Sequence, residues 1–247
     1  SGEIKDNFIW GRGAIDDKSS LISILESIEY LLNEKFIPER DIYISIGHDE
    51  ENGGMKGNAL IAESLKKEGV YFDVVIDEGS AITQGIISGV SSPVAIIGTA
   101  EKGYLSIELT SQYRSGHSSF PGQSTTIGKL SKAIYNLQRN QMRSKLTEPV
   151  KDFLLYLGPE MSLVDRFVIS NYSLLSSFIL GNLELDANTD AMIRTTTAPT
   201  IIDGGNKSNV LPDQAKSIIN FRIRQGDSIK KVEEHVINTV NDSDIQV

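Results

Sequence analysis

The chain has 247 residues, 39% of them hydrophobic, which is enough for one large domain or two ordinary domains with real cores. Its 33 acidic and 24 basic residues give a net charge of -9, which argues against nucleic-acid binding because that needs concentrated Lys and Arg. The absence of cysteine excludes disulfides and thiolate metal sites and does not identify a compartment. No run of about 18 apolar residues occurs, so the sequence predicts no membrane span.

The first 97 residues alternate predicted strands and helices. The predicted elements, in chain order, are a strand at residues 7–10, a helix at 19–36, a strand at 42–46, a helix at 55–68 and a strand at 70–76. Apolar residues recur at helical spacing in 19–36, which predicts a stripe that faces a core. Strands separated by helices of this length favour right-handed βαβ units and therefore a doubly wound α/β fold.

Acidic residues cluster where these strands are predicted to end. The three clusters are Gly-Arg-Gly-Ala-Ile-Asp-Asp-Lys at 11–18, His-Asp-Glu-Glu-Asn-Gly-Gly at 48–54 and Ile-Asp-Glu-Gly at 76–79. Sites in such sheets gather at the carboxyl ends of the strands, so we expect these carboxylates to meet at one edge. Converging carboxylates repel one another unless a cation lies between them. A pair of divalent ions such as zinc, manganese or cobalt suits that position.

The pattern changes near residue 98, where we place the boundary between a partial catalytic domain, 1–97, and a second domain, 98–247. Residues 104–111 alternate apolar and polar side chains, which is typical of an antiparallel sheet with one solvated face. The other predicted elements are a strand at 94–99, helices at 125–138 and 150–158, a polar stretch at 183–209, a strand at 215–224, a helix at 228–240 and a strand at 245–247. This order predicts an α+β sandwich with helices on one face.

Five motifs in this order resemble a known family. They are the three acidic clusters, Ser-Gly-His-Ser-Ser-Phe-Pro at 115–121, and Gly-Asn-Lys-Ser-Asn-Val-Leu-Pro at 205–212 followed by Phe221-Arg222. Across nearly the whole chain they are similar to the binuclear zinc metallopeptidase superfamily of carboxypeptidase S, carboxypeptidase G and the aminoacylases, and most similar to the carboxypeptidase S branch. The resemblance implies a catalytic domain with two zinc ions, cobalt and manganese being alternatives, and a lid domain that forms a homodimer.

The resemblance also implies a set of metal ligands. Asp16 matches the carboxylate that bridges both metals, and the Asp16–Asp17 peptide bond is the one that is usually cis in this family. Glu51 matches a terminal ligand of one metal. The other metal would be bound by Glu78 or Asp77, of which the aminoacylase pattern favours Glu78.

Four further residues match catalytic or substrate-binding positions of the family. Glu50 matches the general base that activates water, and His117 matches a histidine that reaches the active site across a dimer interface and polarises the scissile carbonyl. Asn209 and Arg222 match residues that hold the backbone and the carboxylate of the substrate. An arginine suits a carboxylate because its fork can donate to both oxygens.

Two metal-binding histidines of the family have no counterpart here. The first lies upstream of the Gly-Arg-Gly segment and the last lies far downstream of the lid, and neither is among the three histidines of this chain. We therefore expect the chain to be the middle of a longer enzyme, truncated at both ends and inactive by itself.

Three functions remain open on these residues. The first is a carboxypeptidase that cleaves short peptides with metal-activated water, and the second is an amidohydrolase that cleaves N-acyl amino acids, as aminoacylases do. The third is a non-enzymatic dimerisation fragment. A solute-binding protein is a remote fourth function, because it would not need the adjacent carboxylates Glu50 and Glu51.

Overall fold

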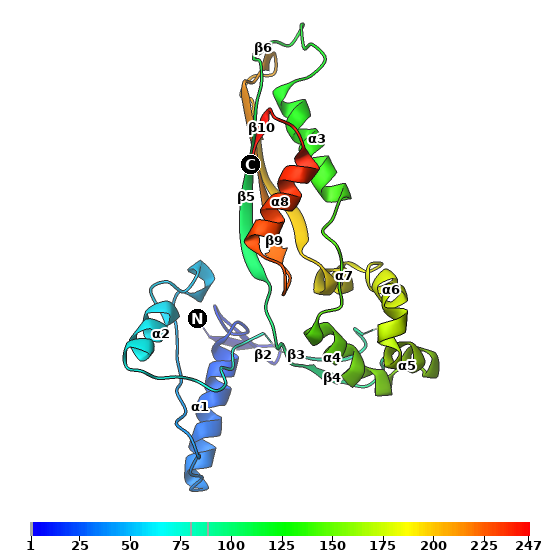
Figure 1. Cartoon of the computed structure of the whole chain (residues 1–247). Coiled ribbons are helices and arrows are strands. Elements are labelled where there is room, and N and C mark those ends of the chain that lie inside the picture. Colours follow the sequence, from blue (N-terminus) through cyan, green and yellow to red (C-terminus); the bar gives the residue numbers. More distant parts are fainter. Residues whose placement is uncertain (1, 80, 88) are drawn as a thin grey trace. The chain divides into compact units, whose positions relative to one another are not determined.

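The computed structural model of the protein describes residues 2–79, 81–87 and 89–247 (Figure 1). The chain divides into two compact units, Ser1–Gly79 and Ser80–Val247. The predicted domain boundary, between residues 97 and 98, stays a prediction. Each unit has its own secondary structure and its own degree of burial, and the two are described in turn.

The first unit contains a hairpin and two helices. Its elements are β1 (Glu3–Lys5), β2 (Phe8–Trp10), α1 (Lys18–Asn33), the 3₁₀ turn η1 (Glu50–Asn52) and α2 (Asn58–Lys67). Residues at the two ends of α1 explain where this helix begins and ends. The Asp17 carboxylate accepts a hydrogen bond from the amide of Ser20 at 3.2 Å, and Lys35, just past the helix, has a φ of 56°. The predicted strand at 7–10 and both predicted helices are thus confirmed, with ends that differ by a few residues.

The βαβ arrangement predicted for the first unit is not confirmed. Strands β1 and β2 pair with each other in antiparallel register, and residues 42–46 and 70–76 are not paired strands. The stripe of α1 is also exposed rather than facing a core, since only Gly57 is buried among residues 2–79. The physical reason is the same in both cases: a strand needs a hydrogen-bonded neighbour and a stripe needs a packing surface, and the described residues of this unit supply neither.

The second unit is built around an antiparallel sheet. The strands β5 (Gly103–Gln112), β7 (Thr196–Gly204), β9 (Gln214–Ile223) and β10 (Ile245–Gln246) form it in the order β10-β5-β9-β7. Helices α3 (Thr126–Arg139) and α8 (Ile229–Val240) cover one face (Figure 1). Two short ribbons complete the set, β3 (Ala81–Thr83) with β4 (Val94–Ile96) and β6 (Gly116–His117) with β8 (Val210–Leu211).

Alternation along the strands positions the core between the sheet and these helices. Leu109 of β5, Ile219 and Phe221 of β9 are fully buried, while their sequence neighbours lie on the other face. The helices complete the core with residues at helical spacing: Leu130, Ala133, Leu137, Val232, Val236 and Val240. The one-faced sandwich predicted from the alternation at 104–111 is therefore confirmed for this unit.

A helical insertion joins α3 to β7. It contains α4 (Glu148–Leu157), η2 (Gly158–Glu160), α5 (Leu163–Ser170), α6 (Tyr172–Leu183) and α7 (Ala187–Ile193), which share a second apolar cluster. In the described part of the chain no single helix is long and apolar enough to cross a membrane; α5 and α6 meet the criterion only as a pair bent by 119°. The sequence analysis interpreted residues 183–209 as a polar stretch without helices or strands, and this interpretation was wrong. It contains α7 and the edge strand β7, whose Thr-rich sequence and Pro199 at a bulge conceal the strand.

Candidate active site

Asp16 lies in the loop before α1. The loop turns back on itself, because the amide of Lys18 donates to the carbonyl of Gly13 at 2.8 Å and Gly13 has a φ of 69°, which favours glycine. The Asp16–Asp17 peptide bond is cis, as the resemblance implies. Asp17 caps α1, so it is engaged with the helix, and Asp16 is the carboxylate of the pair without a capping role.

Glu50 and Glu51 form the start of the short 3₁₀ turn η1. The amides of Asn52 and Gly54 donate to the carbonyl of Asp49 at 3.0 and 2.9 Å, and Gly53 and Gly54 both have positive φ. Asp49 also stabilises the turn, because its carboxylate accepts a hydrogen bond from the amide of Lys56 at 2.7 Å. The turn thus presents two adjacent exposed carboxylates on a backbone that is fixed by its own hydrogen bonds.

Glu78 lies close to the carboxylates of the other two clusters. The charge of Asp16 is the largest cause that raises the pKa of Glu78, followed by burial, a hydrogen bond with Asp17 and the charges of Asp17 and Glu50. Asp77 is engaged locally, because its carboxylate accepts from the amide of Glu78 at 2.9 Å. Three acidic clusters that are distant in sequence therefore approach one another within the first unit.

These carboxylates have the chemistry that a divalent cation needs, but among the described residues they are not arranged around one cation position. A cation would relieve the repulsion that raises the pKa of Glu78, and carboxylate oxygens are common ligands of zinc and manganese. Among residues 2–79, 81–87 and 89–247, however, no three His, Asp or Glu side chains are arranged to hold a metal ion. The described residues bring the carboxylates near one another without forming a complete coordination shell.

In the second unit, His117 and Asn209 lie side by side. His117 of β6 pairs with Val210 of β8, and the amide of Ser118 donates to the carbonyl of Asn209 at 3.0 Å. The Nδ1 atom of His117 accepts from the amide of Ser119 at 3.2 Å and is 2.8 Å from its hydroxyl. If Nδ1 is the acceptor, Nε2 carries the proton, which gives the exposed ring a donor directed at solvent or a ligand.

Arg222 lies at the opposite end of the long strand β9. Gln214 begins β9 just after β8, which Asn209 directly precedes, and Arg222 follows eight positions after Gln214. Eight steps of about 3.3 Å place the two ends of the strand roughly 26 Å apart. The structure therefore brings His117 and Asn209 together and does not bring Arg222 to them within one chain.

Sequence reasoning missed Tyr104, which contacts Arg222. Tyr104 is directly opposite Arg222 in the β5–β9 register, and the guanidinium carbon lies 4.9 Å from the centre of its ring. The signal for this contact is the strand pairing, which could have been found only by aligning the alternation of 104–111 with that of 215–224.

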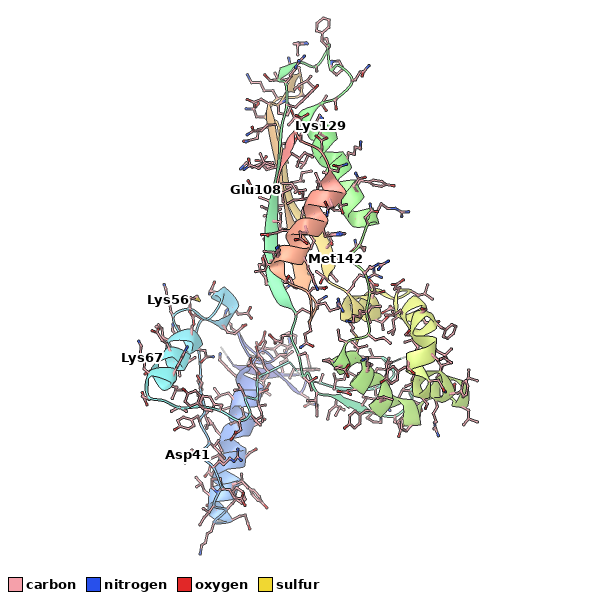
Figure 2. All side chains as sticks on the ribbon, viewed as in Figure 1. Asp41, Lys56, Lys67, Glu108, Lys129 and Met142 are labelled. Atoms are coloured by element: carbon pink, nitrogen blue, oxygen red, sulfur yellow. The ribbon has the colours of Figure 1, made fainter. Side chains whose placement is uncertain are left out.

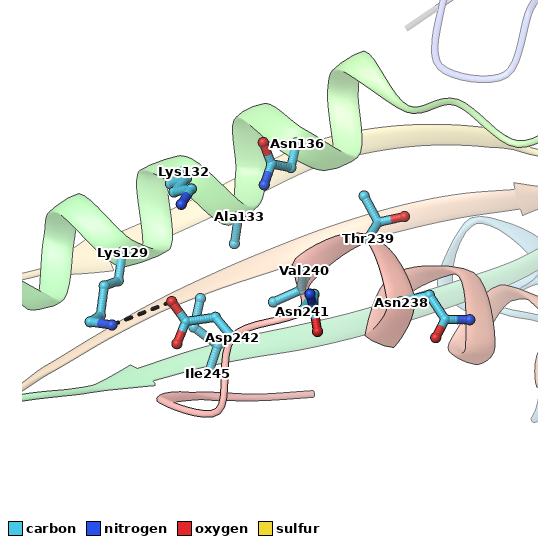
Figure 3. Close-up of a pocket in the computed structure, with 10 residues that line it drawn as sticks. All are labelled: Lys129, Lys132, Ala133, Asn136, Asn238, Thr239, Val240, Asn241, Asp242 and Ile245. Carbon is cyan, nitrogen blue, oxygen red and sulfur yellow. Dashed lines mark hydrogen bonds and ion pairs between the residues drawn. The ribbon is translucent and has the colours of Figure 1, made fainter.

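A cavity of about 260 Å³ lies elsewhere, between α3, α8 and β10, and Figure 3 shows the residues that line it. Lys129 spans it toward Asp242, and none of the predicted site residues contributes to its lining. The predicted site residues therefore lie outside this cavity, the carboxylates in the first unit and His117, Asn209 and Arg222 in the second.

A family described as a peptidase dimerisation domain matches residues 99–246. The whole chain is 40% identical over 248 residues to N-fatty-acyl-amino acid synthase/hydrolase PM20D1 of Xenopus tropicalis, and 41% identical over 249 residues to probable carboxypeptidase S-like 2 of Dictyostelium discoideum. Over 94% of the chain it is 33% identical to carboxypeptidase S of Saccharomyces cerevisiae. The chain covers 48%, 48% and 41% of these proteins, so it spans about half the length of the curated relatives it matches.

Proposed function

Because the chain belongs to the M20 peptidase family, we propose that its natural protein is a metal-dependent hydrolase of amide bonds. The observation that carries the proposal is the identity of 40% and 41% over the whole chain to an N-fatty-acyl-amino acid synthase/hydrolase and a probable carboxypeptidase S-like protein, and the charges of Asp16 and Glu50, which raise the pKa of Glu78, support it.

The roles proposed for the carboxylates are those that the resemblance of their motifs to the family implies. Asp16, Glu51 and either Glu78 or Asp77 would hold two divalent ions, for which zinc is the expected identity. When bound, the ions would lower the pKa of a water molecule and polarise the amide carbonyl. Glu50 would accept a proton from water during attack on the amide and then donate it to the leaving nitrogen.

We further propose that the site is completed in a homodimer. A small substrate cannot contact both ends of β9, and His117 and Asn209 lie at one end while Arg222 lies at the other. The partner subunit's His117 and Asn209 would therefore meet a substrate whose carboxylate is held by Arg222. The match of residues 99–246 to a dimerisation domain supports this arrangement.

The substrate would carry a free carboxylate next to the amide that is cleaved. Short peptides and N-acyl amino acids both satisfy this condition, and the similar proteins include a carboxypeptidase S and an N-fatty-acyl-amino acid synthase/hydrolase. A carboxypeptidase is the first proposal, and an N-acyl amino acid hydrolase is the alternative. Turnover of matched peptide and N-acyl substrates by the natural protein would separate them.

Replacement of Glu50 tests the central proposal. In the natural protein we expect Glu50→Gln to lower kcat by about 10²- to 10⁴-fold while leaving metal content unchanged, because the amide cannot accept the proton. Glu63→Gln, an exposed change in α2, is the matched control and should leave kcat unchanged. Retained turnover in Glu50→Gln would remove Glu50 from the mechanism.

Metal content decides between the two candidate ligands of the second metal. Elemental analysis of Glu78→Gln and Asp77→Asn in the natural protein should show the loss of one metal equivalent in one of them. Loss in Glu78→Gln is expected, because the carboxylate of Asp77 already accepts the amide of Glu78, whereas the charge of Asp16, the expected bridging ligand, acts on the carboxylate of Glu78. Full metal content in both variants would contradict this part of the ligand set.

A further inference from the structure

The face of the sheet that the helices leave open carries a row of polar side chains near Arg222. Leu105 and Ile107 of β5, like Phe221 and Ile223 of β9, belong to the helix-covered face or pack against it. The residues between them therefore belong to the open face. The positions at this end are Tyr104, Ser106, Asn220 and Arg222.

The ring of Tyr104 is held by its neighbours. The hydroxyl of Ser106 donates to the hydroxyl of Tyr104 at 3.3 Å, and the side-chain amide of Asn220 donates to the hydroxyl of Ser106 and to the carbonyl of Leu105, both at 3.4 Å. Tyr104 and Arg222 are a directly opposed cross-strand pair, so their Cβ atoms lie on the same face about 5 Å apart. The backbone pairing places the ring beside the guanidinium, and the long contact of its hydroxyl with Ser106 adds little to that placement.

Arg222 has an aromatic neighbour and no acidic one. In the described ranges 2–79, 81–87 and 89–247 no carboxylate lies within ion-pair distance of Arg222, whereas Arg224 pairs with Asp227 and Arg194 pairs with Glu184. The guanidinium lies 4.9 Å from the centre of the Tyr104 ring, which is within the range of a cation–π contact. An exposed arginine that is oriented by a ring and free of acids can receive an anion.

We propose that Tyr104 is a positioning residue for the substrate carboxylate. Its ring supports the guanidinium of Arg222 in one orientation, so the fork of N–H donors is already arranged when the carboxylate arrives. Without the ring, the long side chain of Arg222 would have to be immobilised by the substrate itself, and binding would weaken. This inference rests on the proposed role of Arg222 and adds to it a residue that acts through the arginine.

A graded series at position 104 in the natural protein tests the inference. Tyr104 is 65% exposed, so substitutions there remove little packing. Tyr104→Leu should raise KM for a substrate with a free carboxylate by about three- to tenfold with kcat within about twofold, since an aliphatic side chain offers no ring face. Tyr104→Phe and Tyr104→Trp keep a ring and should hold KM within about twofold of the unsubstituted enzyme.

Two comparisons show whether the effect passes through Arg222. Arg222→Met should raise KM by about 30-fold or more, and Tyr104→Leu combined with Arg222→Met should be no worse than Arg222→Met alone, because coupled residues are not additive. For a substrate whose carboxylate is replaced by an amide, Tyr104→Leu and the unsubstituted enzyme should have the same KM. Glu108→Gln is the control for a general disturbance of the sheet and should leave KM unchanged, because Glu108 lies on β5 (Figure 2) and strand alternation places it on the same face as Tyr104.

The outcomes separate this inference from the proposed function. A large rise in KM for Arg222→Met without any rise for Tyr104→Leu would overturn the role of Tyr104 and leave that of Arg222 intact. An unchanged KM for Arg222→Met would overturn the carboxylate clamp, and the role of Tyr104 with it. An equal rise for Tyr104→Leu and Tyr104→Phe would also overturn the inference, because the hydroxyl and not the ring would then be responsible.

Discussion

The two units differ in how far local structure is supported by packing. The first unit has two helices, of which α1 has a side-chain cap from Asp17, and only one buried residue, a glycine, among residues 2–79. The second unit has a four-stranded sheet, two covering helices and two apolar clusters. The comparison teaches that capping and helical spacing are sufficient to define a helix, whereas a core also needs strands that pair within the same segment of chain.

The pairing pattern explains the difference. In the second unit β5 and β9 pair in antiparallel register over ten residues, so each strand supplies the hydrogen-bonding neighbour that the other needs. In the first unit the segments 42–46 and 70–76 contact each other through the rings of Tyr43 and Phe72, whose centroids are 5.4 Å apart, but neither segment has a hydrogen-bonded strand partner among the described residues of that unit. Their side chains remain exposed, as Ile44 and Ile76 are.

The largest expected effect is a contrast between isolated fragments. We expect residues 80–247 to unfold in one cooperative thermal transition, because the sheet and its helices share a core, and residues 1–79 to show no cooperative transition, because their apolar side chains are exposed. Calorimetry of both fragments is the measurement. A sharp heat-absorption peak from residues 1–79 would contradict this reading of the first unit.

Truncation of an apolar side chain should be costly in one unit and not in the other. Phe221→Ala removes a fully buried ring and should lower the free energy of unfolding by about 3–5 kcal/mol. Leu25→Ala, on the exposed stripe of α1, should change it by less than about 0.5 kcal/mol. Urea unfolding of the 247-residue chain, followed by circular dichroism, measures both. Equal effects would mean that the stripe of α1 is packed in solution.

Ion pairs sharpen the same contrast. Arg224 and Asp227 are each 9% exposed and Thr195 donates to Asp227 at 2.8 Å, so Asp227→Asn leaves a buried charge and should cost about 3 kcal/mol. Glu63→Gln breaks an exposed pair with Lys67 in α2 and should cost less than about 0.5 kcal/mol. Chemical unfolding of both variants measures the two losses in the free energy of unfolding. The losses would be about equal if burial were unimportant.

The smallest expected effect depends on pH. Lys129 of α3 pairs with Asp242 and Asp244, and Figure 3 shows its contact with Asp242. A hydrogen bond with Asp244 is the main cause that raises the pKa of Lys129, and a hydrogen bond from the amide of Asp244 is the main cause that lowers the pKa of Asp242. Lys129→Met should therefore lower Tm by about 1–3 °C near neutral pH.

The sign of each shift gives the pH range. The lowered pKa of Asp242 stabilises the fold above its unfolded value of about 4, and this contribution is lost as pH falls through the folded value. The raised pKa of Lys129 stabilises the fold below its unfolded value of about 10.4 and is lost as pH rises through the folded value. The Tm difference should be constant from about pH 5 to 9 and shrink below pH 4. Lys230→Met, an exposed change in α8, should show no such dependence.

The inner strands of the sheet in the second unit and the helices that cover it could be predicted from alternation and helical spacing, whereas α5, α6, α7 and β7 were not predicted. The spacing of apolar residues at 104–111 and 228–240 predicted β5 and α8 directly, because each has one covered and one open face. The strand β7 could not be predicted, because an edge strand of Thr residues with a proline at its bulge lacks the apolar alternation of a paired inner strand.

The candidate site divides in the same way. The sequence identified Asp16, Glu50 and Glu78 by their motifs, and the structure brings these three near one another. Asn209 and Arg222 were expected to hold one substrate together, but their separation along β9 depends on the length of an extended strand, which no motif spacing reveals. The roles of these residues stay predictions until the variants are measured.

The sequence by itself determined the helices α1, α2, α3, α4 and α8, the one-faced sheet and the types of residue available for chemistry, because these depend on periodicity and side-chain identity. Only the tertiary structure decided which residues meet. It paired His117 with Val210 beside Asn209, placed Tyr104 against Arg222, and left the stripe of α1 without a packing surface among residues 2–79. Contacts between distant segments depend on strand register and on what covers each face, and neither property is contained in a short stretch of sequence.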